Sequence, residues 1–144
     1  MIQNADIYLA DGIIFDLEDS VDIDEKDNAR NLVRNYLESA VTYPSLSIIR
    51  VNSVDDKNFY LDIELIKTGK VGYILLPKST VDSLNLLEEQ LLNIEKDHDL
   101  IETKVIALVE SAKSVIEVFK IAKHKRVKAI LLGAEDLCND LEIN

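Results

Sequence analysis

The sequence predicts an α/β fold built on a parallel sheet, and two observations support this class. First, five short apolar runs recur along the 144 residues, at 12–16, 46–51, 72–77, 104–109 and 128–133. Second, the segments between these runs carry apolar residues at helical spacing. Runs that are apolar on both faces and alternate with helices are typical of parallel strands that are covered on both sides.

The first two strands are GIIFD at 12–16 and LSIIRV at 46–51. Between them, a helix is predicted by the apolar repeat Ala29, Leu32, Val33, Tyr36 and Leu37. Asp22 and Glu25 resemble a capping box at the start of this helix. After the second strand, residues 59–67 show a weaker helical pattern.

The remaining strands are GYILLP at 72–77, KVIALV at 104–109 and KAILLG at 128–133. The helix after the third strand has one apolar face, formed by Leu84, Leu87, Leu91 and Ile94. The helix after the fourth strand has another, formed by Ala112, Val115, Ile116, Phe119 and Ala122. Polar residues lie on the opposite faces, as in helices that pack one side against a core.

Composition excludes several function classes. With 27 acidic and 16 scattered basic residues, the net charge is −11, so we expect no binding to nucleic acid. The single Cys138 excludes an internal disulfide and a cysteine-built metal site, and we expect it in the core or on a helix. We expect His98 and His124 at the surface, and the KHKR run at 123–126 as a solvated helix end.

The chain reads as a single domain, 1–144, because no low-complexity stretch or Pro/Gly linker divides it. No run approaches the roughly 18 apolar residues that cross a bilayer, and the first ten residues do not have the pattern of a signal peptide. We therefore expect a cytoplasmic protein that does not enter a membrane.

Polar residues follow all five predicted strands. They are Asp16, Glu18 and Asp19 after the first, Arg50 and Asn52 after the second, Lys78 after the third, Glu110 after the fourth, and Glu135 and Asp136 after the fifth. The carboxyl ends of parallel strands meet at one edge of the sheet, where such folds bind ligands. Carboxylates gathered there need cations beside them, which Arg50, Lys78 and a bound Mg²⁺ could supply.

Other readings of these residues remain open. Each one alone could be an ordinary polar loop residue. No nucleotide-binding glycine loop and no G-x-S-x-G elbow occurs in the chain. A signalling receiver domain shares the five-stranded acidic pattern, but it places an aspartate after its third strand and a lysine after its fifth, where this chain has LLPK and LLGAED.

Six blocks, in their order and spacing, closely resemble the citrate lyase beta subunit family, within the broader HpcH/HpaI aldolase and malyl-CoA lyase family: ADGIIFDLEDSV, EKDNAR, IIRVN, LLPKS, IALVES and LLGAEDL. The resemblance covers essentially the whole chain but about half of the family's (β/α)₈ TIM barrel, which typically needs roughly 250 residues. It therefore implies a partial barrel whose five strands match the family's second to sixth, with sheet edges that favour oligomerisation.

The resemblance also implies a reaction and its site. The family cleaves a carbon–carbon bond beside a thioester with Mg²⁺, as when citryl thioester yields oxaloacetate and an acetyl thioester on acyl carrier protein or CoA. By position, Glu110 and Asp136 resemble the metal ligands, and Glu18 and Asp19 resemble the catalytic pair that holds the metal's waters. Arg50 resembles the anchor for the substrate carboxylate, with Lys78 beside it, and Asp16 is expected to be structural.

Two positions depart from the family pattern. Ser114 replaces a glycine four residues after Glu110, a change expected to narrow the space beside the substrate, and Glu142 replaces a glycine near the end of DLCNDLE. The expected partners are a small oxo acid or acyl thioester, together with further copies of the chain or other lyase subunits. The alternative function is a catalytically inactive fragment that binds a metal or a partner subunit.

Overall fold

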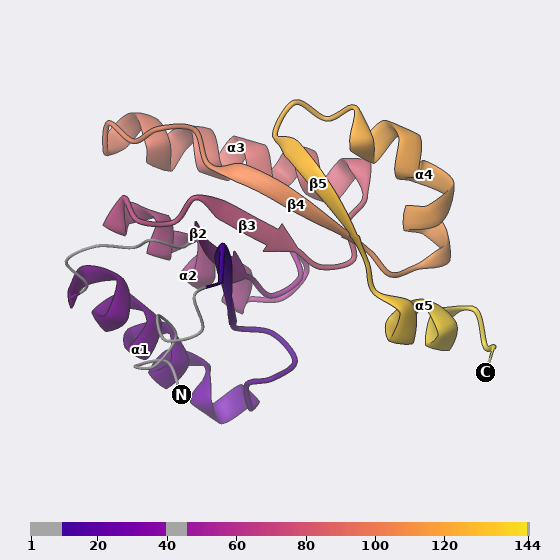
Figure 1. Cartoon of the computed structure of the whole chain (residues 1–144), viewed down its shortest axis with the longest axis horizontal. Helices are drawn as coiled ribbons and strands as arrows, with labels where there is room; N and C mark the ends of the chain where they lie inside the picture. Colours follow the sequence, from indigo (N-terminus) through magenta and orange to yellow (C-terminus); the bar gives the residue numbers. More distant parts are fainter. Residues whose placement is uncertain (1–9, 40–45, 144) are drawn as a thin grey trace.

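The computed structural model describes residues 10–39 and 46–143. These residues form one sheet of five parallel strands in the order β1-β2-β3-β4-β5, with helical segments between the strands (Figure 1). The strands are β1 (Gly12–Asp16), β2 (Leu46–Arg50), β3 (Tyr73–Leu76), β4 (Lys104–Val109) and β5 (Val127–Leu132). The helices are α1 (Lys26–Ser39), α2 (Asn58–Ile63), α3 (Val81–Asp97), α4 (Ala112–Ala122) and α5 (Ala134–Asp140), with the 3₁₀ turns η2 (Ile23–Glu25) and η3 (Glu64–Thr68).

The strand order confirms the predicted class and its barrel-like course. In a doubly wound sheet the strand order reverses, whereas here each strand pairs with the next one along the chain. The register places Asp16 beside Arg50, and Arg50 beside Leu75. Residues that pair across parallel strands share one face, so these side chains belong to a single row.

The core lies on the other face of the sheet. Phe15, Ile49, Ile74 and Ala107 are at most 4% exposed. They pack in one cluster with residues from α1 to α4, namely Val33, Leu37, Phe59, Ile63, Leu84, Leu87, Leu91 and Ile121. Full burial of such a side chain contributes about 1.5–3 kcal/mol each, so this helix-covered face supplies most of the hydrophobic stabilisation.

The expectation that the strands are covered on both sides holds for β3 and β4, where Leu75 and Leu108 are 3% and 5% exposed, and is wrong for β1 and β5. In the described residues the helices pack on one face, and the opposite face borders a cavity where Ile14 is 49% exposed. At β5 both faces are open, because Ile130, Leu131 and Leu132 are 41%, 45% and 63% exposed.

The apolar face predicted for α4 is also largely exposed. Ile116 and Phe119 are 83% and 80% exposed, whereas the buried residues of the helix are Ser114 and Ile121. The packed face of α4 is therefore rotated from the apolar stripe, which leaves an apolar surface beside β5.

Two smaller predictions also need correction. Asp22 caps the turn η2 by accepting from the N–H of Asp24, and Glu25 accepts from Asn28 instead of returning a bond to Asp22. The KHKR run is not a solvated helix end, because Arg126 is 1% exposed and binds both carboxylate oxygens of Glu95 at 2.8 Å. A guanidinium buried at this depth needs such a partner.

The two histidines differ. His98 is exposed at the end of α3, as expected. His124 is largely buried, with its side chain 11% exposed, and burial lowers its pKa. The segment 59–67, expected to be a helix, consists of α2 followed by η3.

Candidate metal and oxo-acid site

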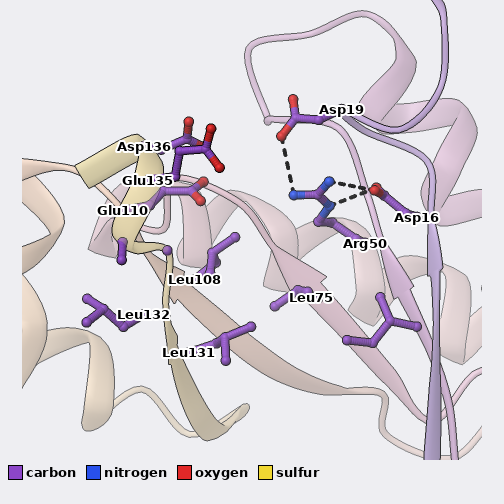
Figure 2. Close-up of a pocket in the computed structure, with 13 residues that line it drawn as sticks. Asp16, Asp19, Arg50, Leu75, Leu108, Glu110, Leu131, Leu132, Glu135 and Asp136 are labelled. Carbon is purple, nitrogen blue, oxygen red and sulfur yellow. Dashed lines mark hydrogen bonds and ion pairs between the residues drawn. The ribbon is translucent and has the colours of Figure 1, made fainter. Parts of the chain in front are cut away.

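A cavity of about 790 Å³ lies at the carboxyl edge of the sheet and is bordered by residues of all five strands. Its polar lining is Asp16, Asp19, Arg50, Glu110, Glu135 and Asp136. In Figure 2, Glu110, Glu135 and Asp136 lie on one side of the cavity, and Arg50 lies on the other side between Asp16 and Asp19. The apolar floor comes from the open face of the sheet, including Leu75 and Leu108.

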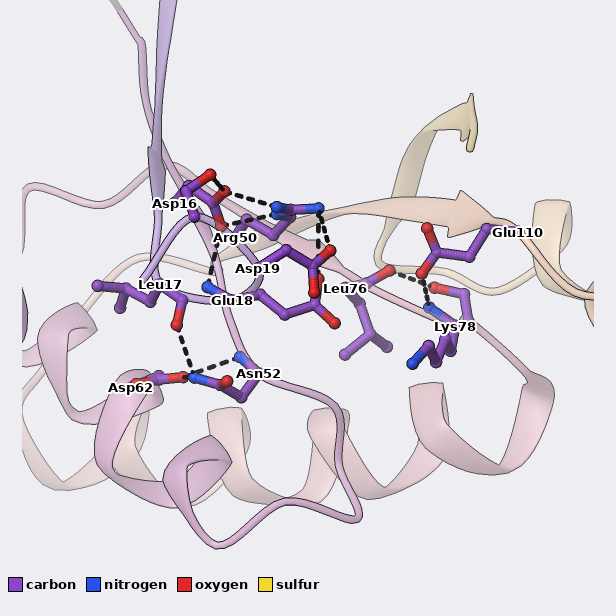
Figure 3. Close-up of polar contacts among 12 residues, drawn as sticks. Asp16, Leu17, Glu18, Asp19, Arg50, Asn52, Asp62, Leu76, Lys78 and Glu110 are labelled. Carbon is purple, nitrogen blue, oxygen red and sulfur yellow. Dashed lines mark hydrogen bonds and ion pairs between the residues drawn. The ribbon is translucent and has the colours of Figure 1, made fainter. Parts of the chain in front are cut away.

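Arg50 is held by Asp16 in a two-pronged contact. Its Nε and Nη2 atoms donate to the two carboxylate oxygens of Asp16 at 2.7 and 2.5 Å (Figure 3). Burial alone would raise the pKa of Asp16, but the hydrogen bonds from Arg50, Ser20 and the Glu18 N–H lower it to about 2. Asp16 therefore stays ionised and fixes the plane of the guanidinium.

The third nitrogen of Arg50 is turned toward Glu18 and Asp19, which form the acidic loop after β1. Its Nη1 atom lies 3.3 Å from an oxygen of Glu18 and 3.3 Å from an oxygen of Asp19. Burial and the neighbouring charge of Asp19 raise the pKa of Glu18 to about 7, and Glu110 adds to this effect. Glu18 therefore binds a proton more readily than an ordinary glutamate, as expected for a carboxylate that is removed from water beside another carboxylate.

Glu110 is buried at the end of β4, where Lys78 and Gly133 hold it. The Lys78 N–H donates to its Oε1 atom at 2.7 Å, and Lys78 itself adopts a left-handed φ of 46°. A Cβ atom at Gly133 would lie 2.7 Å from both Cβ and Oε2 of Glu110, so no other residue fits there without displacing the carboxylate. Burial raises the pKa of Glu110, and the charge of Asp136 raises it further.

Asp136 lies in the first turn of α5 and lines the cavity beside Glu135. The apolar strand β5 ends at Leu132, and Gly133 then joins it directly to α5. This short connection brings Asp136 to the side of the cavity that Glu110 occupies (Figure 2).

A buried polar network holds the backbone at the start of the acidic loop. The ammonium of Lys26 donates to the carbonyls of Leu17 and Glu18 at 2.7 and 2.6 Å, and to Asn52 at 2.9 Å. Asn52 donates in turn to the carbonyl of Leu17 and to Asp62 (Figure 3). The sequence analysis did not single out Lys26, although it lies in the EKDNAR block.

The structure brings most of the sequence-predicted site residues together. Asp19, Arg50, Glu110 and Asp136 line the same cavity, and Glu18 reaches it through its contact with Arg50. The side chain of Lys78 instead borders a neighbouring cavity with Thr80, Ser111 and Lys113. Its connection to the site is the backbone bond to Glu110 and the charge that its ammonium contributes near Glu18 and Glu110.

Ser114 does not narrow the cavity, contrary to expectation. Its side chain is fully buried and forms the capping box at the start of α4 with Ser111. Its hydroxyl oxygen also accepts from the N–H of Glu110 at 3.2 Å. The residue therefore supports the backbone that carries Glu110.

Within residues 10–39 and 46–143, no three His, Cys, Asp or Glu side chains gather closely enough to form a metal-ligand cluster by themselves. Over the same residues, no helix combines the length and apolar character needed to pass through a bilayer.

Comparison with known proteins finds relatives that align with nearly the whole chain. The model of the family described as HpcH/HpaI aldolase/citrate lyase matches residues 1–144. The citrate lyase subunit beta of Escherichia coli K12 is 35% identical over 98% of this chain and 48% of its own length. A (3S)-malyl-CoA thioesterase of Cereibacter sphaeroides is 34% identical over 97% of this chain and 46% of its own length.

A solved structure agrees with the fold. The citrate lyase beta subunit of Mycobacterium tuberculosis, complexed with oxaloacetate and magnesium, aligns with a TM-score of 0.74 and 26% identity. The alignment covers 99% of this chain and 58% of that one. The present chain spans about half the length of the curated relatives it matches. With a family model matched from end to end, the chain belongs to the HpcH/HpaI aldolase/citrate lyase family.

Proposed function

We propose that this chain binds Mg²⁺ together with an oxo-acid carboxylate, and that it carries this part of the site of a carbon–carbon lyase acting on citryl or related thioesters. The observation that carries the proposal is the cavity itself. It gathers Asp19, Arg50, Glu110 and Asp136 from four strand ends that are distant in the sequence. Lyase-type relatives and a neighbour complexed with oxaloacetate and magnesium support the same assignment.

Glu110 and Asp136 would hold the metal. Magnesium usually takes one or two protein carboxylates and completes its six positions with water and substrate oxygens, so this pair is a sufficient protein contribution. Both supply oxygen ligands, and burial together with the charge of Asp136 raises the pKa of Glu110, which a bound cation would counteract. When bound, Mg²⁺ would polarise the oxo-acid oxygens and stabilise the negative charge that develops during cleavage.

The remaining residues would position substrate and water. Arg50, oriented by Asp16, would bind a substrate carboxylate through its Nη1 side, which is the least engaged edge because its contacts with Glu18 and Asp19 are long, at 3.3 Å, while Nε and Nη2 bind Asp16 at 2.7 and 2.5 Å. Glu18 and Asp19 would accept hydrogen bonds from the metal's waters. Lys78 would contribute through its N–H to Glu110 and the charge of its ammonium.

The proposed substrates are thioesters carried on acyl carrier protein or CoA, and the proposed partners are further copies of this chain or other lyase subunits. Two curated relatives are a citrate lyase subunit and a malyl-CoA thioesterase, so the thioester class is better supported than any individual acyl group. The cytoplasmic location stays a prediction.

The proposal is tested by titrating the chain with Mg²⁺ and oxaloacetate in a calorimeter. We expect saturable binding in the wild type, and a loss of at least about tenfold in affinity in Glu110→Ala. Glu102→Ala is the matched control, because Glu102 is an exposed glutamate outside the cavity. Lys78→Gly separates the two roles of that residue, since it keeps the N–H and the left-handed backbone but removes the ammonium.

Absence of binding in the wild type, or equal affinity in the wild type and Glu110→Ala, would refute the proposal. Incubation with citryl and malyl thioesters then distinguishes the reaction class. Release of an oxo acid identifies carbon–carbon cleavage, release of free thiol with the intact hydroxy acid identifies thioester hydrolysis, and binding without products identifies the non-catalytic alternative.

A further inference from the structure

Helix α5 is attached to the rest of the structure by very few polar contacts. It has no buried residue, and its backbone hydrogen bonds are made within the helix or to the residues that directly flank it, Gly133 before it and 141–143 after it. Among the residues that the structure describes, one hydrogen bond links it to another element. The Asp140 carboxylate accepts from the N–H of Ala112, at 2.7 Å.

This bond connects the two segments that carry the proposed metal ligands. Ala112 begins α4 and lies two residues after Glu110, while Asp140 lies one helical turn after Asp136 on α5. The bond therefore ties the segment that carries one acidic residue to the helix that carries the other. Glu110 and Asp136 are like charges on one side of the same cavity, so without a tether their repulsion favours the displacement of α5.

The start of α4 is a suitable anchor. Its capping box satisfies the N–H of Ser114 through Ser111, whereas the N–H of Ala112 in the first turn has no partner within the helix. A carboxylate is favoured at this end of an 11-residue helix by the helix dipole. Asp140 therefore makes a charge-assisted bond at an otherwise unpaired donor.

We propose that Asp140 is a positioning residue that holds α5, and with it Asp136, beside Glu110. The inference rests on the proposed function in so far as Glu110 and Asp136 bind the metal. Asp140 itself touches neither metal nor substrate, and it acts by fixing the separation of the two ligands.

The test compares Asp140→Ala with Asp140→Asn in the full chain, using two measurements. Hydrogen exchange of the α5 amides, recorded without metal, reports on the tether alone. Calorimetric titration with Mg²⁺ and oxaloacetate reports on its consequence. We expect Asp140→Ala to exchange faster across α5 and to bind Mg²⁺ about tenfold more weakly, and Asp140→Asn to stay near the wild type because its amide oxygen can still accept from Ala112.

Thr80→Ala is the matched control. It removes the N-cap of α3, so it should lower the melting temperature without changing exchange in α5 or the affinity for Mg²⁺. Unchanged exchange in Asp140→Ala would overturn the inference whatever the metal does. Faster exchange with unchanged Mg²⁺ affinity would reduce Asp140 to a structural contact and also overturn it. A wild type that fails to bind Mg²⁺ would instead refute the proposed function, while the exchange data still decide whether the tether exists.

Discussion

Asp16 and Glu18 lie two residues apart in the same loop, yet the structure gives them opposite acidities. Asp16 receives two bonds from Arg50, and its pKa falls to about 2. Glu18 is buried beside Asp19 and receives a weaker contact from Arg50, and its pKa rises to about 7. Burial raises the pKa of both carboxyls, but only Asp16 receives the two-pronged contact of Arg50 that outweighs it, so Asp16 positions Arg50 while Glu18 binds a proton more readily.

This contrast predicts how stability depends on pH. Without metal, the pKa of Glu18 is about 7 in the folded chain, against an ordinary value of 4.5. The folded state therefore holds more protons than the unfolded state between these values, and the contribution of Glu18 to stability declines as pH rises from about 4.5 to 7. We expect Glu18→Gln to remove this decline, measured by urea unfolding at pH 5 and pH 8 without metal.

Asp16→Asn is the control, because the contribution of Asp16 to stability changes with pH in the opposite direction. The pKa of Asp16 is lowered from 3.8 to about 2, so its contribution is present above pH 3.8 and is lost as pH falls toward 2. Asp16→Asn should therefore destabilise the chain at pH 5 and pH 8 alike. Unfolding curves of Glu18→Gln that shift with pH as the wild type does would argue against a raised pKa at Glu18.

At Glu142, the backbone conformation decides how a substitution changes the stability of α5. It follows α5 in a left-handed conformation with φ of 54°, and the bonds from Glu142 to Asn139 and from Ile143 to Cys138 form a Schellman motif. The left-handed conformation costs residues other than glycine about 1–2 kcal/mol. The glycine expected here from the family pattern would avoid this cost.

We therefore expect Glu142→Gly to stabilise α5 by about 1 kcal/mol. The measurement is hydrogen exchange of the α5 amides, because this helix can open locally without unfolding the whole chain. Glu102→Gly is the comparison, since no left-handed backbone is found at Glu102 and glycine should there be neutral or destabilising. Faster exchange in Glu142→Gly would contradict the assignment.

At the scale of elements, the network around Lys26 joins α1 to the ends of β1 and β2. Lys26 is 8% exposed and donates to two carbonyls and to Asn52. Asp62 of α2 binds Asn52 on one side and Arg30 of α1 on the other, at 2.8 Å. Four segments around the acidic loop are thus fixed by buried polar contacts in addition to apolar packing.

Loss of Lys26 should therefore be costly. Lys26→Met keeps most of the side-chain volume but removes three buried hydrogen bonds from a charged donor, each contributing about 1.5–3 kcal/mol. It leaves the Oδ1 atom of Asn52 unpaired, while the carbonyls of Leu17 and Glu18 keep bonds from Asn52 and Val21. We expect a loss of roughly 3 kcal/mol or more in the free energy of unfolding, measured by urea denaturation. Lys57→Met, at an exposed lysine near the same helices, should change stability by no more than about 0.5 kcal/mol. Similar losses in both variants would contradict the special role of Lys26.

At the scale of the whole molecule, the described sheet has two unpaired edges, at β1 and β5, and an apolar surface beside the second edge. This α4–β5 surface consists of Val115, Ile116, Phe119, Ile130 and Leu132, which are between 41% and 83% exposed. Exposed apolar side chains next to an open strand edge favour association.

We expect the chain to self-associate through the α4–β5 surface. Light scattering coupled to size-exclusion chromatography should give a mass above the 16.2 kDa of one chain. Ile116→Ser with Phe119→Ser should shift the mass toward the monomer, because both side chains are at least 80% exposed and their replacement costs little in the folded monomer. Leu92→Ser is the matched control, since Leu92 is an exposed residue of α3. A monomeric wild type would contradict the prediction.

The sequence by itself predicted the elements and the edge where the polar residues meet. Apolar runs specify strands through burial, and helical spacing specifies helices, so β1 and β4 have the predicted limits and the other strands differ by one or two residues. Parallel strands then bring their ends together, which is why Asp19, Arg50, Glu110 and Asp136 were found in one cavity. The family pattern likewise indicated that position 142 favours glycine.

Tertiary structure decided what depends on the surroundings of each residue. A periodic stripe does not specify which face of α4 is packed, because neighbouring elements determine the rotation of the helix. The acidities of Asp16 and Glu18 depend on where one guanidinium points. The burial of Arg126 depends on a glutamate that lies 31 positions away in the sequence. The backbone N–H of Lys78 binds Glu110, and Asp140 joins two helices, and both contacts depend on distances that arise when the sheet brings its strand ends together.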